Sequence, residues 1–399
     1  MKFLFILITL LFITHSFTQN QWVQKDSING APRSVASAFV LNGEGYVLAG
    51  LDDNGFRRKM YSYTFWQDDW DDEASIGGVS GSGLARGSAS SFSIYNKGYI
   101  CLGQGATNPF FNDLWEYDPI TKIWTQKADF IGSARRSAVA FTLNDTIAYV
   151  GTGISTNGFE KDMYKYSSTT NTWTQISDFG GTARKEAVGF TMGGQGYIGT
   201  GDDGIYRNDF WQYQPDTDTW IQKADFPGTP RKGAVGWGIF PSAFIATGED
   251  NTFTYKKDVW EYNYFSDTWV QRADFMGEGR SNAIVFVLQD LAFVGSGSNG
   301  EFKDDVYAYR RIVGVNEMEN QIDFSIYPNP IKANFNVKTN IQNAKFQIIS
   351  LDGKTIPIDG IKTPEGYKFI RPNSPAGQYF LQITDLNSSY KHQNKITLL

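Results

Sequence analysis

Short runs of alternating apolar and polar residues recur along most of this chain, and no stretch places its apolar residues at the helical period. Runs such as SAVAFTL and EAVGFTM are followed by AYVGTG or GYIGTG, then by DLWEYD or DFWQYQ, and then by a Trp in settings such as WTQKADF. Turns rich in Gly, Asp and Asn separate these segments, which are themselves rich in aromatic and β-branched residues. The pattern predicts an all-β protein built from units of four short antiparallel strands.

This unit occurs six times, and a Trp marks each copy. Successive Trp residues are 48, 54, 49, 47 and 49 residues apart. In five copies an Arg follows the Trp by eleven residues, and in the other it follows by sixteen, across the insertion GGVSGSG. The marker residues are Trp22, Trp70, Trp124, Trp173, Trp220 and Trp269. A period near 49 residues with four strands per unit is typical of the blades of a β-propeller.

The units repeat the same motifs in the same order, namely Arg, Tyr-x-x-x-Gly, Asp-aromatic and Trp. This order resembles that of the kelch repeat family, over roughly residues 20–312. The resemblance implies a six-bladed propeller, which we assign to residues 19–312. One departure is the first of the two glycines that kelch repeats usually pair. At that position we expect Ala49, Gln104, Thr152, Thr200, Thr247 and Ser296.

The two ends of the repeat array predict how the ring closes. The sixth unit runs through Tyr309, but seven residues later the chain has Asn316 instead of a Trp. The missing Trp strand is present at the other end, because Trp22 precedes the first repeat Arg. An open ring would leave two unpaired sheet edges, so we expect the segment QWVQK to complete the last blade.

Two residue sets recur in all six units, near loops that open on one face of such a propeller. The first is the repeat Arg, whose members are Arg33, Arg86, Arg135, Arg184, Arg231 and Arg280. The second is an aromatic residue seven positions before each Tyr, and its members are Phe56, Phe110, Phe159, Tyr206, Tyr255 and Phe302. Arg binds carboxylate or phosphate through two parallel hydrogen bonds, and aromatic rings stack on sugar faces. Both sets are therefore candidate ligand contacts.

A structural role for both sets is the competing interpretation, because an asymmetric ligand rarely needs six equal contacts. Each Arg would then pair with an Asp at the start of the third strand, and the aromatic residues would cover the loop backbone. The candidate Arg partners are Asp113, Asp162, Asp209, Asp258 and Asp305. The first unit has Lys59 where the other units have this Asp.

Positions that break the six-fold symmetry are better candidates for specificity. Arg136, Lys185 and Lys232 each follow directly after a repeat Arg in three consecutive units. The loops of the first, fourth and fifth units carry charges of both signs, at Asp52, Asp53, Arg57, Arg58, Lys59, Asp202, Asp203, Arg207, Glu249, Asp250, Lys256 and Lys257. Solvated turns are the simpler explanation for such mixed loops. The paired Asp residues do not have EF-hand spacing, so we predict no metal site.

The rarest residues exclude several classes of chemistry. The chain has one Cys, Cys101, and two His, His15 and His392. A disulfide, a Cys-based zinc site and a Ser-His-Asp triad are therefore not expected, and no cofactor is predicted. Copper-radical oxidases on kelch propellers need a Cys cross-linked to Tyr and two His ligands, which this chain lacks. The formal net charge of −6 does not fit a nucleic-acid partner.

Residues 1–18 read as a secretory signal peptide. Lys2 precedes an apolar run from Phe3 to Ile13, and Ser16 and Thr18 are small residues before a possible cleavage point. As a helix, the eleven-residue run would span about 16 Å, whereas a bilayer core is roughly 30 Å thick, so a membrane anchor is the less favoured alternative. No later stretch is apolar enough to cross a membrane.

The repeats stop at residue 313. We expect a polar linker at 313–323 and a small β-sandwich at 324–399, where apolar and polar residues alternate between Pro, Asn and Gly turns. The order of motifs in this segment resembles the type A sorting domain of the type IX secretion system of Bacteroidetes. The residues that carry the resemblance are Tyr327, Pro328, Asn329, Pro330, Asp352, Gly353, Gly377 and Tyr379. The terminus departs from the family, since it ends in Leu398 and Leu399 instead of a basic residue.

The second resemblance implies export by the type IX machinery, which would be the partner of residues 324–399, and a secreted or surface-attached product. We expect the propeller to be a binding module for a surface protein or a polysaccharide, and not an enzyme. A sugar-processing enzyme similar to the kelch sialic-acid mutarotases is the alternative, since that chemistry needs mainly Arg and carboxylates. A purely structural or adhesive surface protein is the third hypothesis.

Overall fold

The computed structural model describes residues 21–81, 84–107, 109–311, 324–329, 331–339, 344–350, 355–363, 366–385 and 391–399. The predicted signal peptide, the linker 313–323 and the sorting residues Pro330, Asp352 and Gly353 lie outside the described residues. Internal contacts divide the chain into two compact units, Met1–Ile312 and Val313–Leu399. Each unit is described by itself below.

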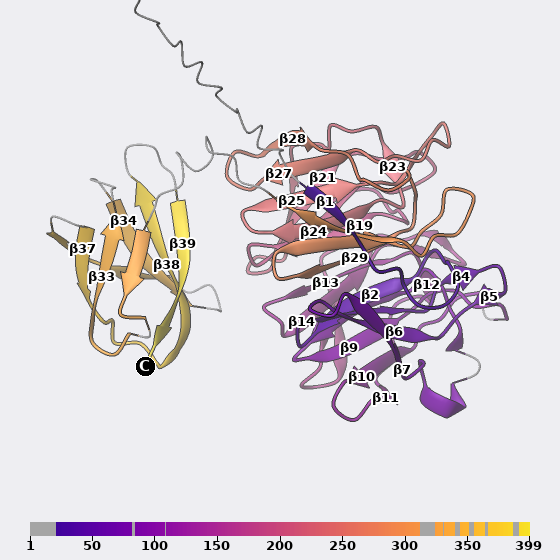
Figure 1. The fold of residues 1–399 in the computed structure, drawn as a ribbon, viewed down its shortest axis with the longest axis horizontal. Coiled ribbons are helices and arrows are strands. Elements are labelled where there is room, and N and C mark those ends of the chain that lie inside the picture. Colours follow the sequence, from indigo (N-terminus) through magenta and orange to yellow (C-terminus); the bar gives the residue numbers. More distant parts are fainter. Residues whose placement is uncertain are drawn as a thin grey trace, which may run out of the picture. The chain divides into compact units, whose positions relative to one another are not determined.

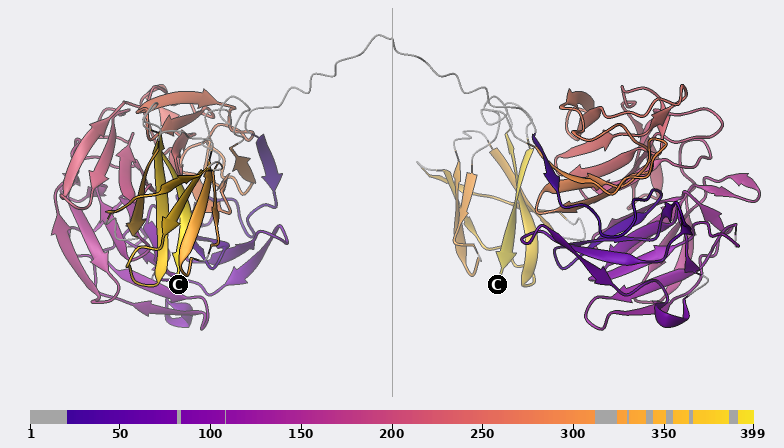
Figure 2. Two further views of the ribbon diagram at one scale, coloured as in Figure 1. Left: turned by 90° about the vertical axis from the view of Figure 1, so that its left-hand side faces the viewer. Right: turned by 45° about the vertical axis from the view of Figure 1, so that its right-hand side comes forward.

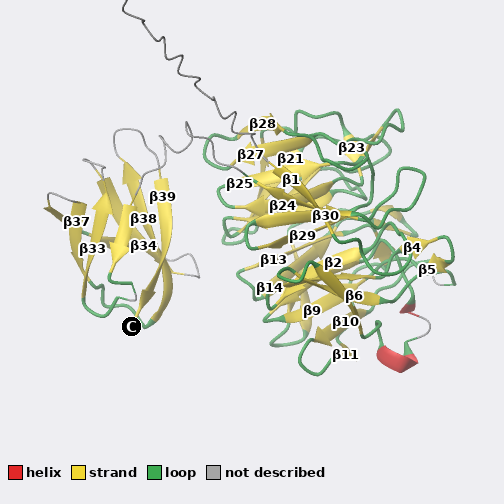
Figure 3. Ribbon diagram, viewed as in Figure 1, coloured by secondary structure: helices red, strands yellow, loops and turns green. Residues whose placement is uncertain are grey.

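The first unit is a β-propeller whose described residues form six four-stranded antiparallel blades (Figures 1 and 3). The strands of blades one to three are β2 (Ser37–Leu41), β3 (Glu44–Leu48), β6 (Met60–Thr64) and β7 (Asp69–Glu73); β8 (Ser90–Ile94), β9 (Lys97–Cys101), β10 (Leu114–Asp118) and β11 (Ile123–Gln126); and β13 (Val139–Leu143), β14 (Ile147–Gly151), β17 (Met163–Ser167) and β18 (Thr172–Ile176). Those of blades four to six are β19 (Val188–Met192), β20 (Gln195–Gly199), β21 (Phe210–Gln214) and β22 (Thr219–Lys223); β24 (Val235–Ile239), β25 (Ser242–Ala246), β27 (Val259–Asn263) and β28 (Thr268–Arg272); and β29 (Ile284–Leu288), β30 (Leu291–Gly295), β31 (Val306–Arg310) and β1 (Gln21–Lys25). One short 3-10 turn, Gly78–Ser80, lies in the insertion of blade one.

Local sequence explains these strands. In β2 alternate residues are buried, as the apolar-polar alternation of SAFVL predicts. The link from β2 to β3 is the dipeptide Asn42-Gly43, with φ values of 50° and 83°. A two-residue hairpin turn of this twist requires positive φ at both positions, which Asn and Gly supply most readily.

The N-terminal strand closes the ring as the repeat arithmetic predicts. β1 pairs antiparallel with β31, in a register that places Trp22 opposite Tyr309. The Trp22 ring also makes an edge contact with Phe275 of blade five, at a centroid distance of 5.0 Å. The left view of Figure 2 shows the blades following one another around the ring from indigo to orange. The last blade therefore takes its outermost strand from the start of the propeller.

Six apolar cores hold the blades together, one at each interface between neighbours. The core at the closing interface joins Tyr63 and Trp70 of blade one to Phe286 and Phe293 of blade six. It resembles the other five cores, which also combine the Tyr and Trp of one blade with apolar residues of its neighbour. Along the axis the innermost strands contact one another in a closed cycle, which consists of β2, β8, β13, β19, β24 and β29.

The second unit is a β-sandwich of two four-stranded sheets, ordered β32-β33-β37-β36 and β35-β34-β38-β39. Its strands are β32 (Phe324–Tyr327), β33 (Asn334–Thr339), β34 (Ala344–Ser350), β35 (Thr355–Ile358), β36 (Ile361–Thr363), β37 (Gly366–Ile370), β38 (Gly377–Asp385) and β39 (Lys391–Leu398). The Asn329 side chain accepts a hydrogen bond from the Thr397 amide at 2.9 Å, and Ile331 forms a parallel bridge with Leu398. The segment that begins with the Tyr327-Pro328-Asn329 motif therefore fixes the last strand.

Candidate functional site

The repeat Arg residues are buried, with exposed fractions of 0–2%. Five of them form two-pronged ion pairs with the predicted Asp residues, such as Arg86 with Asp113, at 2.6 and 2.7 Å. The other four pairs are Arg135–Asp162, Arg184–Asp209, Arg231–Asp258 and Arg280–Asp305. Each pair joins the loop before the first strand to the start of the third strand of the same blade.

The other donors of each guanidinium group also have partners within the propeller. Arg184 donates from Nε to the Thr182 carbonyl oxygen at 3.0 Å and from Nη1 to that of Thr200 at 2.9 Å. Its guanidinium carbon lies 5.0 Å from the ring centroid of Phe179, which belongs to the preceding blade. Since the charge and most of the donors of the five paired Arg residues are occupied within the propeller, a structural role is the simpler interpretation for these five.

These ion pairs leave an electrostatic signature on two of the acids. Burial alone would raise the pKa of Asp162, but the hydrogen bonds and positive charge of Arg135 outweigh it, and the pKa is lowered. The same balance between burial and Arg231 lowers the pKa of Asp258. Both carboxyl groups are therefore ionised at neutral pH, as an ion pair requires.

The six aromatic residues are half-buried and lie in the loops between the second and third strands. Small hairpins hold several of these loops, for example β15 (Ile154–Ser155) with β16 (Gly158–Phe159) and β4 (Leu51–Asp52) with β5 (Gly55–Phe56). The repeat Arg segment lies on the same face, because β12 (Arg135–Arg136) pairs with β15. The two sets therefore lie at the same face of the propeller.

One position of the kelch-like motif was assigned incorrectly from the sequence. The residue before the retained glycine has φ between 58° and 63° in every blade, and in blade two that residue is Leu102, not Gln104. The glycine after it, Gly103, donates its amide to the carbonyl oxygen of Arg135 in the next blade at 2.9 Å. A second nearby glycine, Gly105, caused the error, since the sequence does not show which of the two binds the neighbouring blade.

A ring of main-chain hydrogen bonds closes around the axis, two residues after each repeat Arg. The amide of Ser88 donates to the Val35 carbonyl oxygen at 2.9 Å, and the same contact recurs from blade to blade until Val35 donates to Asn282 at 3.2 Å. The six residues are Val35, Ser88, Ser137, Glu186, Gly233 and Asn282, and all have φ between 49° and 60°. The backbone at this ring is therefore the same in all six blades, while the side chains differ.

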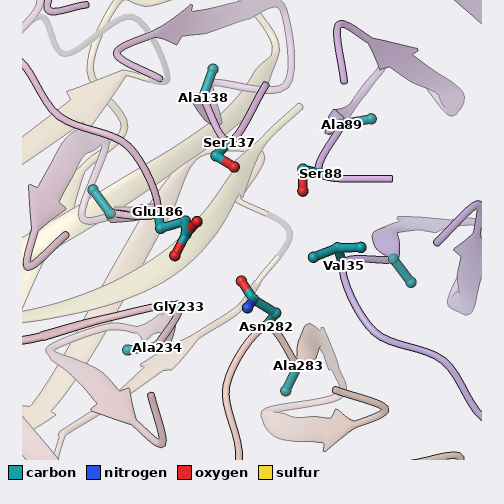
Figure 4. A pocket seen from close by; sticks show the side chains of 12 residues that line it. Val35, Ser88, Ala89, Ser137, Ala138, Glu186, Gly233, Ala234, Asn282 and Ala283 are labelled. Atoms are coloured by element: carbon teal, nitrogen blue, oxygen red, sulfur yellow. The ribbon is translucent and has the colours of Figure 1, made fainter. Parts of the chain in front are cut away.

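These six residues and the six that follow them line a cavity of about 180 Å³, which we call the channel mouth. The side chains of Ser137, Glu186 and Asn282 point toward its middle (Figure 4). The following residue is Ala in every blade, at positions 36, 89, 138, 187, 234 and 283. The small Ala residues keep the cavity open, and the ring residues determine its chemistry.

One sector of the mouth carries charge. The Glu186 carboxylate lies 3.5 Å from Lys185 Nζ and 3.8 Å from Lys232 Nζ, and all three side chains are at most one-fifth exposed. Lys185 also lies 3.6 Å from Asp202, and Lys232 pairs in a short ladder with Glu249. We call these five residues of blades four and five the polar sector.

The aromatic set adds to the same sector, since its two Tyr members belong to blades four and five. Lys232 Nζ lies 5.1 Å from the Tyr206 ring centroid. Burial alone would lower the pKa of Lys232, but Glu186 and Tyr206 outweigh it, so the pKa is raised and the ammonium group stays charged. At the equivalent ladder position blade three has Arg136 opposite Ile154, and blade one has Ser34 opposite Leu51.

The remaining charged loops are largely self-neutralised. Arg57 binds Asp52 at 2.5 Å, Arg207 binds Asp203 at 2.8 Å and Lys256 binds Asp250 at 2.5 Å.

The sequence-based prediction singled out Lys185 and Lys232 as candidate site residues but missed Glu186 and Asn282. The signal that would have found them is the position two residues after each repeat Arg, where the six units differ most in chemistry.

No group of three or more His, Cys, Asp or Glu residues in the described part of the chain has the arrangement of a metal site. Burial raises the pKa of the Cys101 thiol, which therefore stays protonated. None of the described helical segments has the length and apolar character needed to cross a bilayer.

The fold and site define a class: a six-bladed β-propeller with one charged sector at its channel mouth, in a chain that continues into a β-sandwich. Residues 325–397 match the secretion system C-terminal sorting domain family. The chain thus carries a type IX sorting domain and is a secreted or outer-membrane surface protein. A solved structure entitled "Structure of YjhT" is similar to the chain, with 16% identity, a TM-score of 0.60, and coverage of 71% of this chain and 95% of that one. At this identity the likeness shows the fold alone, and no curated protein matches.

Proposed function

We propose that the propeller is a surface binding module that holds its ligand at the channel mouth, through the polar sector of blades four and five. The observation that carries the proposal is the asymmetry of the mouth. Its backbone is six-fold regular, yet Glu186, Lys185 and Lys232 meet on one side only. Residues that build every blade alike are occupied by the fold, so the irregular side chains are the ones available for specificity.

The chemistry of the sector favours a ligand with several hydroxyl groups, such as the terminal unit of a polysaccharide. A carboxylate accepts two hydroxyl hydrogen bonds, and two ammonium groups donate to hydroxyl or carboxylate oxygens. The cavity of about 180 Å³ is smaller than the 300–1,000 Å³ of a drug-sized pocket. It therefore suits one sugar unit or one peptide side chain.

A glycan array probed with the secreted full-length chain tests the proposal. We expect a hit whose affinity falls at least tenfold in Glu186→Gln and in Lys232→Met. The matched control is Lys165→Met, because Lys165 is an exposed Lys on β17 away from the mouth. Equal binding by all four proteins would place the ligand elsewhere and overturn the proposal.

The mutarotase-like alternative would use the same groups, with Glu186, Lys232 and Tyr206 as candidates for proton transfer. It predicts that the chain speeds the exchange of sugar anomers, which NMR measures directly, and that Glu186→Gln abolishes the exchange. Stable binding without faster exchange supports the binding module. An adhesive role would give neither signal.

A further inference from the structure

Arg33 differs from the five other repeat Arg residues, because no carboxylate among the described residues forms an ion pair with it. Its side chain is as buried as the others, with an exposed fraction of 2%. It donates to the Ala31 carbonyl oxygen at 3.1 Å, and more weakly to the Ala49 carbonyl oxygen and the Tyr61 hydroxyl, both at 3.4 Å. A buried charge without an oppositely charged partner is unfavourable, so the lack of an ion-pairing carboxylate at Arg33 needs an explanation.

The backbone of blade one still has the geometry that presents an acid to Arg33. The Ala49 amide donates to the Lys59 carbonyl oxygen at 3.0 Å, as the Thr152 amide donates to that of Asp162 at 3.2 Å in blade three. Residue 59 is thus at the position of the pairing Asp. Its own side chain is 40% exposed and its Nζ binds Asp72 at 2.8 Å, on the blade surface.

The surroundings of Arg33 are otherwise those of an oxyanion site. In blade three the Tyr164 hydroxyl donates to Asp162 at 2.9 Å, and the residue equivalent to Tyr164 in blade one is Tyr61. The Tyr61 ring lies 5.1 Å from the Arg33 guanidinium carbon. The acid Asp52 interacts electrostatically with Arg33 but forms no ion pair with it, since its carboxylate accepts from Arg57 at 2.5 Å and from the Asn54 amide at 2.8 Å.

We propose that Arg33 and Tyr61 form a binding site for a carboxylate group from outside the repeat, at the position that an Asp fills in five blades. The site is separate from the polar sector, which lies in blades four and five. In the other blades the Asp side chains at this position are 13–23% exposed, and a carboxylate would reach the site in blade one along the corresponding path from solvent. The carboxylate would form two parallel hydrogen bonds with the guanidinium group, as Asp113 does with Arg86.

Thermal unfolding of the secreted full-length chain in sodium formate tests this site, with sodium chloride at equal ionic strength as the reference. Formate is planar and can make both hydrogen bonds, whereas chloride cannot. We expect formate to raise the wild-type melting temperature by about 1–3 °C over chloride and to saturate. Lys59→Asp should supply the missing carboxylate, raise the melting temperature by itself and abolish the formate response.

Two further variants separate the proposal from general effects of charge or folding. Lys59→Met removes the same positive charge without adding an acid, so it should keep the formate response. Asp162→Ala removes the carboxylate that pairs with Arg135. The melting temperature of this variant should rise further in formate than that of the wild type, because formate then binds at two positions. An equal formate effect in wild type and Lys59→Asp, or no effect in wild type when Asp162→Ala responds, would overturn the proposal.

Carboxylate probes of different size distinguish the possible sources of the carboxylate. A response to formate and acetate alone indicates a small free anion. A comparable response to N-acetyl-aspartate amide indicates an acidic side chain of a polypeptide. Both results support a carboxylate site at Arg33, and neither bears on the polar sector.

Discussion

The main-chain amide of Val35 donates a hydrogen bond to the carbonyl oxygen of Asn282 at 3.2 Å, and this contact joins the first blade to the sixth. It completes a cycle of six such bonds around the channel mouth. The two residues are far apart in sequence, so their approach depends on closure of the ring, in which β1 pairs with β31 and β2 contacts β29. The ring that presents the polar sector is therefore coupled to the strand that closes the propeller.

Trp22→Ala should destabilise the propeller by about 2–4 kcal/mol, because the Trp22 ring packs on Phe275 and Tyr309 across the closing blade. The matched control is Val23→Ala on the same strand, where the side chain is 52% exposed and the cost should stay below about 0.5 kcal/mol. Urea unfolding of the secreted chain measures both. Equal, small effects would mean that this strand contributes little to closure.

Arg184→Ala should cost about 3–5 kcal/mol, because it leaves the Asp209 carboxylate in a partly buried site without its partner. Arg33→Ala should cost clearly less, since no carboxylate is left without its partner in blade one. The comparison keeps the type of substitution constant and changes only the ion pair. A cost at Arg33 as large as at Arg184 would show that packing of the Arg chain, and not the ion pair, carries the stability.

The Arg135–Asp162 pair should make stability depend on acid pH. Because the folded-state pKa of Asp162 is lowered from 3.8, the contribution of this group is fully present above about pH 4 and is lost as the pH falls further. The difference in urea midpoint between wild type and Asp162→Asn should therefore be constant from pH 7 to pH 5 and shrink toward pH 3. Asp178→Asn, at an exposed position, is the matched control for the substitution itself.

The positions before and after the kelch-like glycine should respond in opposite directions. Gly201 has a φ of 100°, and a Cβ there would lie 2.9 Å from the Lys185 carbonyl oxygen, so Gly201→Ala should destabilise by about 1–3 kcal/mol. Thr200 has a φ of 58° and a buried hydroxyl without a partner among the described residues. Thr200→Gly should stabilise by about 0.5–1 kcal/mol, as thermal unfolding would show.

Much of the fold was predictable because each blade is specified by local sequence. Apolar alternation and the Asn42-Gly43 turn act within one unit, and the spacing of the Trp residues shows that this unit occurs six times, which predicts a ring. The partners of the repeat Arg residues were predictable for the same reason, since each Asp belongs to the same unit as its Arg. The assignment of Gln104 failed where the deciding contact, from Gly103 to Arg135, crosses to the next blade.

What the sequence by itself determined is the repeating unit and the sorting domain, because the information for each lies in a short stretch of chain, and the strand that completes the last blade, because comparing the two ends of the repeat array shows which strand is missing. Only the tertiary structure decided which irregular residues meet. Lys232 reaches Glu186 across a blade interface, and Asn282 shares the channel mouth with Val35, because closing the ring places the same position of every unit around one axis. Likewise, the sequence shows Lys59 where five units have Asp, but only the fold shows that this change leaves the buried Arg33 guanidinium group without an ion-pairing carboxylate among the described residues.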